Sequence, residues 1–265
     1  MQWENLTAPE FAEAVRETDV CVFAMGICER HSDHLPIGQD FLAVHKIACL
    51  AAEREPAVVF LPWYFGQIFE AKCWPGAVSI GPELLFPLLE GVFDEIGRNG
   101  FKKILIVDGH GGNRFLVPFL AQLSLDKQKP YSVYMCRPFP GQEKPEWDET
   151  VETDLHWHAC ECETSIAMAV HPELVKTDKI PKEPGEPLKR LEHLGEAFTG
   201  IGWYADFPEH YAGDASYATP EKGKKLLELR VDSIAEQIAA VKADKAVPAL
   251  EKEFFDRVRK QAEGE

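Results

Sequence analysis

Residues 20–40 read Val20-Cys21-Val22-Phe23-Ala24-Met25-Gly26-Ile27-Cys28-Glu29-Arg30-His31-Ser32-Asp33-His34-Leu35-Pro36-Ile37-Gly38-Gln39-Asp40. The apolar run at its start predicts a buried strand, and the loop that follows gathers carboxylates and imidazoles. In an extended segment, residues i and i+2 point to the same side, so Glu29 and His31 can converge on one point. Asp40 comes after a turn and opens the next helical pattern, which can return it to that point. This combination predicts a metal or acid–base site at the end of the strand.

Taken singly, these residues have simpler explanations. Asp40 alone is equally well explained as a carboxylate at a helix N-terminus, and His31 and His34 as surface residues of a loop. Two further stretches favour the site. A second buried run, 104–107, leads into Asp108-Gly109-His110-Gly111-Gly112-Asn113. The third stretch is His156-Trp157-His158-Ala159-Cys160-Glu161-Cys162-Glu163-Thr164-Ser165.

Strand and helix patterns alternate along the chain. Apolar runs predict strands over 20–26, 58–61, 103–107 and 131–135, and helical spacing predicts helices over 40–54, 84–96 and from Asn113 onward. This alternation predicts a three-layer α/β/α fold with a mostly parallel sheet, and we expect residues 1–265 to form a single domain. Right-handed crossovers would place the loops 27–40 and 108–113 at the carboxyl edge of the sheet, where open α/β sheets bind ligands.

The remaining segments are less regular. We expect loops over 138–155 and 176–217 and helices over 163–170, 221–242 and 249–265. The long segment 176–217 is a candidate lid or oligomer contact.

Composition limits the possible partners and location. The chain has 28 basic and 44 acidic residues and a formal net charge of −16, which argues against nucleic acid and anionic membranes as partners. No apolar stretch is long enough to span a bilayer, and the N-terminus lacks the basic and apolar regions of a signal peptide. The odd number of cysteines, seven, fits reduced thiols better than a disulfide framework. We therefore expect a cytoplasmic protein.

The three motifs together resemble the creatininase (creatinine amidohydrolase) family, and Gly213-Asp214 and Ala218-Thr219-Pro220-Glu221-Lys222-Gly223 resemble its closing segment. The resemblance implies a metal-dependent amidohydrolase. Such an enzyme hydrolyses an amide or cyclic amide C–N bond of a small, non-peptide molecule through a water activated by two metals. It also implies a homo-oligomer, since the family's name-giving enzyme is a hexamer.

The resemblance also implies a ligand set of imidazoles and carboxylates, a mixture that suits Zn, Mn or Fe. By this resemblance, Asp40 matches the bridging carboxylate, Glu29 and His110 would hold one metal with it, and His31 would help to hold the other. Two divalent ions per chain are expected.

The last ligand is open from the sequence. The name-giving enzyme has a glutamate at the position of Gly112, whereas in relatives with Gly-His-Gly-Gly-Asn the glutamate of Glu-Thr-Ser serves instead. We therefore select Glu163, with Glu161 as the alternative. Helical spacing puts these two on different faces, so only one is expected to ligate. Glu161 is accordingly grouped with His158, the match to the family's catalytic histidine, as a catalytic residue acting beside the metals.

Several positions depart from the family pattern without removing a ligand: Ser32, Gln39, Asp108 and Cys160. Gln39 and Cys160 adjoin ligands, so we expect a reshaped pocket. A tryptophan of the creatinine site falls here at Asp154, which argues against creatinine itself, and Trp147 and Trp157 are candidates to replace it. The other histidines, His34, His45, His171, His193 and His210, are expected to be structural or at the surface, with His34 also a candidate neighbour of the ligands.

Two other classes of function compete with the amidohydrolase. A non-catalytic ligand-binding or scaffold protein could retain the fold, but it has no need of converging metal ligands. A metal-dependent phosphoesterase is disfavoured because no basic phosphate clamp accompanies the motifs. A phosphate-cradling loop at 109–112 is disfavoured because His110 interrupts it and no lysine follows.

Overall fold

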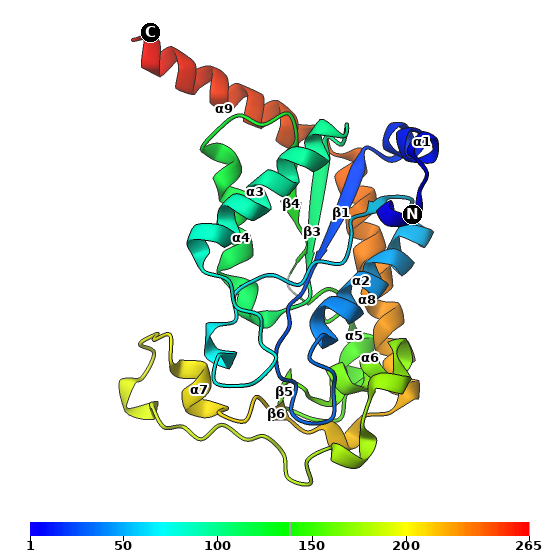
Figure 1. Ribbon diagram of the computed structural model, residues 1–265, viewed down its shortest axis with the longest axis vertical. Coiled ribbons are helices and arrows are strands. Elements are labelled where there is room, and N and C mark those ends of the chain that lie inside the picture. Colours follow the sequence, from blue (N-terminus) through cyan, green and yellow to red (C-terminus); the bar gives the residue numbers. More distant parts are fainter. Residues whose placement is uncertain (138, 265) are drawn as a thin grey trace.

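The computed structural model describes residues 1–137 and 139–264. At its centre is a parallel sheet in the order β2-β1-β3-β4. A separate antiparallel pair, β5 and β6, lies beyond the lower edge of this sheet in Figure 1. The strands are β1 (Val20–Met25), β2 (Val58–Val59), β3 (Lys103–Asp108), β4 (Ser132–Met135), β5 (His156–His158) and β6 (Ala212–Gly213).

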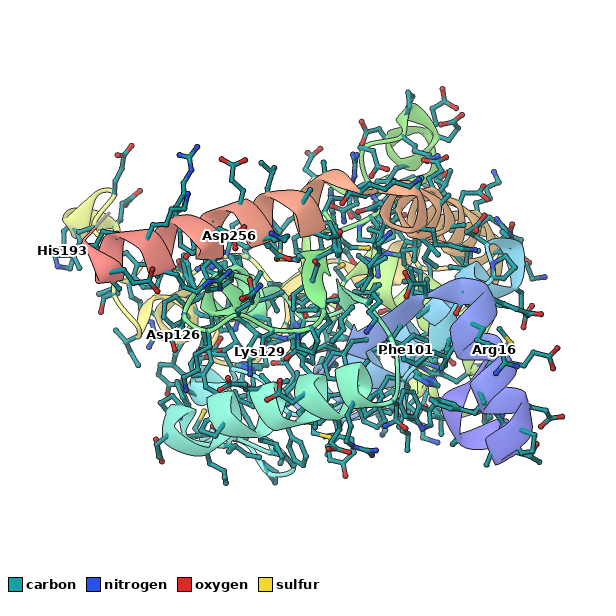
Figure 2. All side chains as sticks on the ribbon, turned by 90° about the horizontal axis from the view of Figure 1, so that it is seen from above. Arg16, Phe101, Asp126, Lys129, His193 and Asp256 are labelled. Carbon is teal, nitrogen blue, oxygen red and sulfur yellow. The ribbon has the colours of Figure 1, made fainter. Side chains whose placement is uncertain are left out.

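Helices cover both faces of the sheet, as Figures 1 and 2 show. They are α1 (Ala8–Thr18), α2 (Gln39–Arg54), α3 (Pro82–Arg98), α4 (Leu116–Gln122), α5 (Pro145–Thr150), α6 (Glu161–Val170), α7 (Gly202–Asp206), α8 (Pro220–Ala243) and α9 (Ala246–Glu263). The predicted three-layer α/β/α fold with a parallel sheet is confirmed. No helix within the described residues combines the length and the apolarity that a membrane span requires.

Strand pleating divides the core into two layers. Along β1, Val22 and Ala24 pack toward α2, α6 and α8, whereas Phe23 and Met25 pack toward α1, α3 and α4. Because successive side chains of a strand point to opposite faces, a strand buried on both faces must be apolar at every position. This requirement explains the uninterrupted apolar runs in the sequence.

The boundaries of several elements differ from the predictions. The strand predicted at 58–61 is shorter, Val58–Val59, although the Phe60 amide still donates to the Val22 carbonyl of β1 over 2.8 Å. The helix predicted from Asn113 begins as a 3-10 turn, Gly111–Arg114, before α4. The terminal helix predicted at 249–265 begins earlier, at Ala246, and residue 265 lies outside the described residues.

Both predicted loops contain regular structure. The segment 138–155 includes α5, whose Trp147 is 1% exposed and fills the core against α8; residue 138 lies outside the described residues. The segment 176–217 includes α7 and β6, and β6 pairs with β5 at the site end of the sheet. In both segments, burial of aromatic residues orders a sequence that has little periodicity of its own.

The close contact between α6 and α8 yields a test of this packing. A Cβ at Gly223 in α8 would lie 1.8 Å from the Ser165 carbonyl oxygen in α6. We therefore expect Gly223→Ala to push the helices apart and lower the free energy of unfolding by about 1–3 kcal/mol or more. Urea denaturation measures the change.

Gly91→Ala is the matched control, since Gly91 also lies inside a helix and a Cβ added there would meet nothing within 4 Å. That variant should be neutral or more stable by up to about 1 kcal/mol, because alanine is the better helix former. Equal unfolding midpoints for the two variants would contradict the packing described here.

Candidate metal centre

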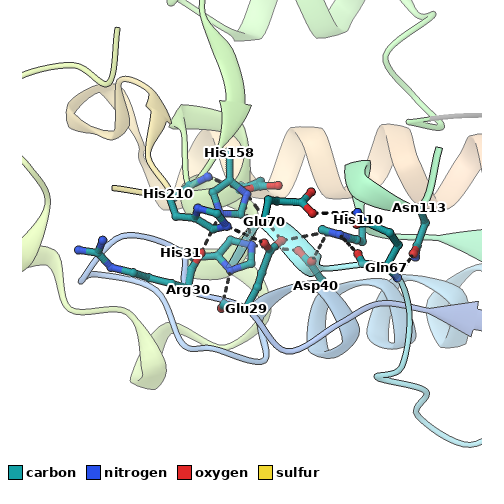
Figure 3. Close-up of polar contacts among 12 residues, drawn as sticks. Glu29, Arg30, His31, Asp40, Gln67, Glu70, His110, Asn113, His158 and His210 are labelled. Atoms are coloured by element: carbon teal, nitrogen blue, oxygen red, sulfur yellow. Dashed lines mark hydrogen bonds and ion pairs between the residues drawn. The ribbon is translucent and has the colours of Figure 1, made fainter. Parts of the chain in front are cut away.

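Histidines and carboxylates from three loops meet at the carboxyl edge of the sheet (Figure 3). The loop after β1 supplies Glu29 and His31, and the first turn of α2 supplies Asp40. His110 follows β3, and His158 ends β5 just before α6, which carries Glu163 in its first turn.

A close backbone approach brings the first turn of α2 against the end of β1. A Cβ at Gly26 would lie 2.3 Å from the backbone nitrogen of Phe41, so only glycine lets the two segments pack this tightly. The loop between them is closed by the Glu29 amide, which donates to the Ile37 carbonyl over 3.0 Å. The turn therefore returns Asp40 to the end of the strand, as predicted.

Asp40 lies between two histidines and directs one carboxylate oxygen at each. His31 Nε2 is 2.9 Å from Asp40 Oδ1, and His110 Nδ1 is 3.0 Å from Asp40 Oδ2. Each histidine also faces a second carboxylate: Glu29 Oε1 is 2.9 Å from His110 Nδ1, and Glu163 Oε2 is 3.9 Å from His31 Nε2. The arrangement is two imidazole–carboxylate groups that share Asp40.

Backbone carbonyls orient the ring of each of these histidines and of His158. His31 Nδ1 lies 3.3 Å from the Glu29 carbonyl, His110 Nε2 2.9 Å from the Gln67 carbonyl, and His158 Nε2 2.8 Å from the Arg30 carbonyl. A carbonyl oxygen only accepts, so each of these nitrogens carries the hydrogen. In the neutral ring, the other nitrogen is then an unprotonated ligand or base directed at the carboxylates.

The site's charges are strongly coupled. Burial disfavours protonated His31, but the carboxylates of Asp40, Glu163 and Glu29 outweigh it and raise the pKa of His31 to about 10. Burial likewise opposes the charge on His110, yet Glu29 and Asp40 raise its pKa well above the usual value. Positive charge at this position is therefore strongly favoured, whether protons or metal ions supply it.

Two groups of side chains meet the geometry of a metal site. Glu29, Asp40 and His110 form one, and His31, Asp40 and Glu163 form the other; within each, the ligand atoms lie within 4.8 Å of one another. Glu29 Oε1 and Asp40 Oδ2 are buried and accept no well-directed hydrogen bond, although both lie close to His110 Nδ1. One ring nitrogen cannot donate to both oxygens, so a cation satisfies them better than a proton, and the residues fit divalent metals.

Glu161 lies outside these groups. Its side chain is fully buried, accepts hydrogen bonds from the backbone amides of Glu152 and Thr153, and pairs with Lys222. The glutamate two residues later, Glu163, reaches His31 because it lies on the other side of α6. The structure thus brings together Glu29, His31, Asp40, His110, His158 and Glu163, and it places Glu161 in a structural ion pair.

Two of the four departures from the family pattern, Asp108 and Gln39, have local hydrogen-bond partners. Asp108 Oδ1 accepts from the backbone amide of His110 (3.1 Å) and from Asn113 Nδ2 (2.9 Å), which holds the histidine's loop in place. Gln39 Oε1 accepts from His171 Nε2 at 2.8 Å. His34 lies behind the ligands, with its Nε2 2.8 Å from Thr164 Oγ1.

The two candidate tryptophans have different surroundings. Trp147 is buried in the core, whereas Trp157 is 60% exposed and packs on Phe207. Phe207 in turn contacts Trp203 of α7, whose ring lies edge-on to His158 with centroids 5.9 Å apart. An aromatic wall of Trp157, Trp203 and Phe207 therefore stands beside His158.

Sequence reasoning missed His210. The sequence predicts a structural or surface histidine there. The structure buries it fully beside the candidate ligands, with its Nε2 3.5 Å from Glu29 Oε2 and its ring edge-on to His158. No periodicity marks the residue; the one clue in the sequence is its place just before Gly213-Asp214.

Comparisons with known proteins agree with this geometry. The creatininase family model, described as creatinine amidohydrolase, matches residues 4–238. Among curated relatives, a 3-dehydro-scyllo-inosose hydrolase of Thermotoga maritima is 25% identical over 87% of this chain and 80% of its own length. A mycofactocin precursor peptide peptidase of Mycolicibacterium smegmatis is 29% identical over 83% of this chain and 85% of its own.

Solved structures share the fold. A creatinine amidohydrolase (creatininase) crystal structure superposes with a TM-score of 0.79 at 21% identity, covering 92% of this chain and 98% of that one. A putative creatinine amidohydrolase from Bacteroides fragilis superposes with a TM-score of 0.77 at 23% identity, covering 92% and 97%. Because the family model spans nearly the whole chain and the fold and the motifs agree with it, the chain belongs to the creatininase family.

Proposed function

We propose that this chain is a metal-dependent amidohydrolase that hydrolyses an amide or cyclic amide C–N bond of a small molecule. The observation that carries the proposal is the buried Asp40 carboxylate, which divides its two oxygens between His31 and His110 while each histidine faces a second carboxylate. A scaffold protein gains nothing from burying these groups together, since each buried charge must be compensated.

The ligands support two divalent ions per chain. Glu29, Asp40 and His110 would hold one ion, and His31, Asp40 and Glu163 would hold the other. Related creatininase structures are described as Zn–Zn and Mn forms, which supports zinc or manganese here. Bound in these positions, the ions would supply an activated water and polarise the scissile carbonyl.

His158 is suited to move the proton. Its Nε2 hydrogen is held by the Arg30 carbonyl, so Nδ1 faces the site, 3.8 Å from Glu29 Oε1. Burial lowers the pKa of His158, with Glu29 opposing this effect, so the ring is neutral near pH 7. Nδ1 can therefore accept a proton from the attacking water and deliver it to the leaving nitrogen, which breaks the C–N bond.

The substrate is proposed as a small, non-peptide amide. The relatives' names cover creatinine, 3-dehydro-scyllo-inosose and a precursor peptide, so a peptide is the competing substrate. A pocket beside His110 is lined by polar Asp108 and Asn113 and by apolar Val117, Met135 and Phe139.

Turnover measured on a panel of small amides and on a panel of short peptides separates these two substrate classes.

A cytoplasmic homo-oligomer remains part of the proposal. Phe115 and Phe198 are 62% and 72% exposed yet pack on each other, with the Arg114 guanidinium over both rings. Exposed aromatic clusters are typical of protein interfaces. A monomer mass in light scattering over a range of concentrations would contradict this expectation.

The first prediction concerns metal content. Protein loaded with Zn²⁺ or Mn²⁺ and then dialysed should retain about two ions per chain, as two-metal hydrolases do. His110→Ala should lose metal and activity together, because it removes the Nδ1 ligand. His45→Ala is the control, since that half-buried histidine contacts the Phe60 carbonyl away from the ligands. Full metal content and turnover in His110→Ala would refute the ligand assignment.

A second prediction separates the two glutamates of α6. Glu163→Gln should lower metal occupancy and turnover, because an amide is a poorer ligand than a carboxylate. Glu161→Gln should keep the metals and instead lower the melting temperature, because it leaves Lys222 without its buried partner. Metal analysis and thermal denaturation of both variants measure the difference; the reverse pattern would make Glu161 the ligand.

The third prediction concerns His158. His158→Ala should keep both metals while turnover falls by about 10²–10⁴-fold, the usual contribution of a positioned acid–base group. If the histidine is merely packed beneath Trp203, its removal should lower the melting temperature more than turnover. Loss of metal in this variant would make His158 a ligand instead.

A further inference from the structure

His210 is a buried polar side chain without a partner. Its exposure is 0%, and neither Nδ1 nor Nε2 makes a hydrogen bond to any described residue. Buried polar groups in folded proteins are nearly always paired, because leaving one unpaired costs about 1–3 kcal/mol. The other site histidines each donate to a backbone carbonyl, so His210 is the exception that requires an explanation.

The backbone holds His210 in this place at some cost. Its φ is 49°, in the left-handed region that non-glycine residues rarely adopt, where strain is of order 1–3 kcal/mol. The His210 carbonyl accepts from the Ser32 amide over 3.1 Å, and the Glu209 carbonyl accepts from Arg30 Nη1 over 2.7 Å. Residues 209 and 210 are thus hydrogen-bonded to the loop that carries Glu29 and His31.

The charged acceptor near His210 Nε2 is the Glu29 carboxylate. The ring lies edge-on to His158 and to Trp203, with centroids 5.4 Å and 6.3 Å away. Nε2 lies 3.5 Å from Glu29 Oε2, on the opposite carboxylate oxygen from the one that faces His110. A shift of roughly half an ångström brings this pair to hydrogen-bond distance. Figure 3 shows His210 and His110 on opposite sides of the Glu29 carboxylate.

We propose that His210 is a positioning residue of the metal centre. Its Nε2–H donates to Glu29 Oε2 and fixes the carboxylate so that Oε1 is presented beside His110 and Asp40. Partners of this kind, which orient a metal-ligating carboxylate from behind, typically change metal affinity about 10–100-fold. The inference rests on the proposed function, because it assigns Glu29 to a metal.

Two amide substitutions of different length test which ring nitrogen of His210 is the donor. A glutamine at 210 can place its amide nitrogen near the position of Nε2, whereas an asparagine places its nitrogen near Nδ1 and tolerates left-handed backbone well. Zn²⁺ affinity is measured on the full chain by competition with a chromophoric chelator, and the melting temperature is measured on the metal-free protein. His45→Asn and His45→Gln are the matched controls.

We expect His210→Asn to weaken the affinity for one of the two ions by about 10–100-fold, and His210→Gln to stay within about threefold of the parent. The His45 variants should match the parent. If His210→Asn binds Zn²⁺ as tightly as the parent, the inference is overturned. Parent-like Zn²⁺ affinity together with a lowered melting temperature would show that His210 has a purely structural role. Equal losses in both variants also overturn it. A parent chain that binds no Zn²⁺ or Mn²⁺ overturns the proposed function as well, so the two failures are distinguishable.

Discussion

The shared carboxylate of Asp40 is the interaction on which the site depends. Three carboxylates, Glu29, Asp40 and Glu163, lie close together at the edge of a buried core, and their mutual repulsion must be offset. His31 and His110 hold the pKa of Asp40 well below its usual range in spite of burial. Asp40 also lies in the first turn of α2, where the helix dipole favours negative charge. The negative charge of Asp40 therefore stabilises the N-terminus of α2 and also favours a cation at the site.

The fold positions these charged side chains through its strands and the backbone of the loops that follow them. The parallel strands β1 and β3 end side by side, so the loops after them deliver Glu29 and His110 to adjacent points. Backbone carbonyls of the loop after β1 then fix the ring orientations of His31 and His158. These histidine rings are thus oriented by main-chain atoms, which are positioned by the apolar layers on the two faces of the sheet. Stability of the core and precision at the site have the same origin.

The segment between α6 and α8 contributes side chains that surround the site. It places Trp203 beside His158 and His210 beside Glu29. Hydrogen bonds to Arg30 and Ser32 connect it to the loop that carries Glu29 and His31. Left-handed backbone occurs at Ser32, Ala159 and His210, and two of these residues directly follow the site histidines His31 and His158. Strain of this kind persists only where the surrounding structure enforces it, and it concentrates at functional sites.

The sequence alone determined the parallel α/β class, because doubly buried strands must be apolar throughout and their alternation with helices admits few topologies. Motif spacing and the resemblance selected Glu29, His31, Asp40, His110 and Glu163, since short loops after strands leave side chains little freedom. The resemblance preferred Glu163 to Glu161, but only the tertiary structure shows their different surroundings: the packing of α6 against α8 gives Glu161 a buried partner in Lys222, whereas Glu163 lies near His31. Only the tertiary structure brings His210 to Glu29, which lies 181 positions earlier in the sequence. No local pattern encodes that contact, because it depends on where an irregular segment is fastened to the rest of the fold.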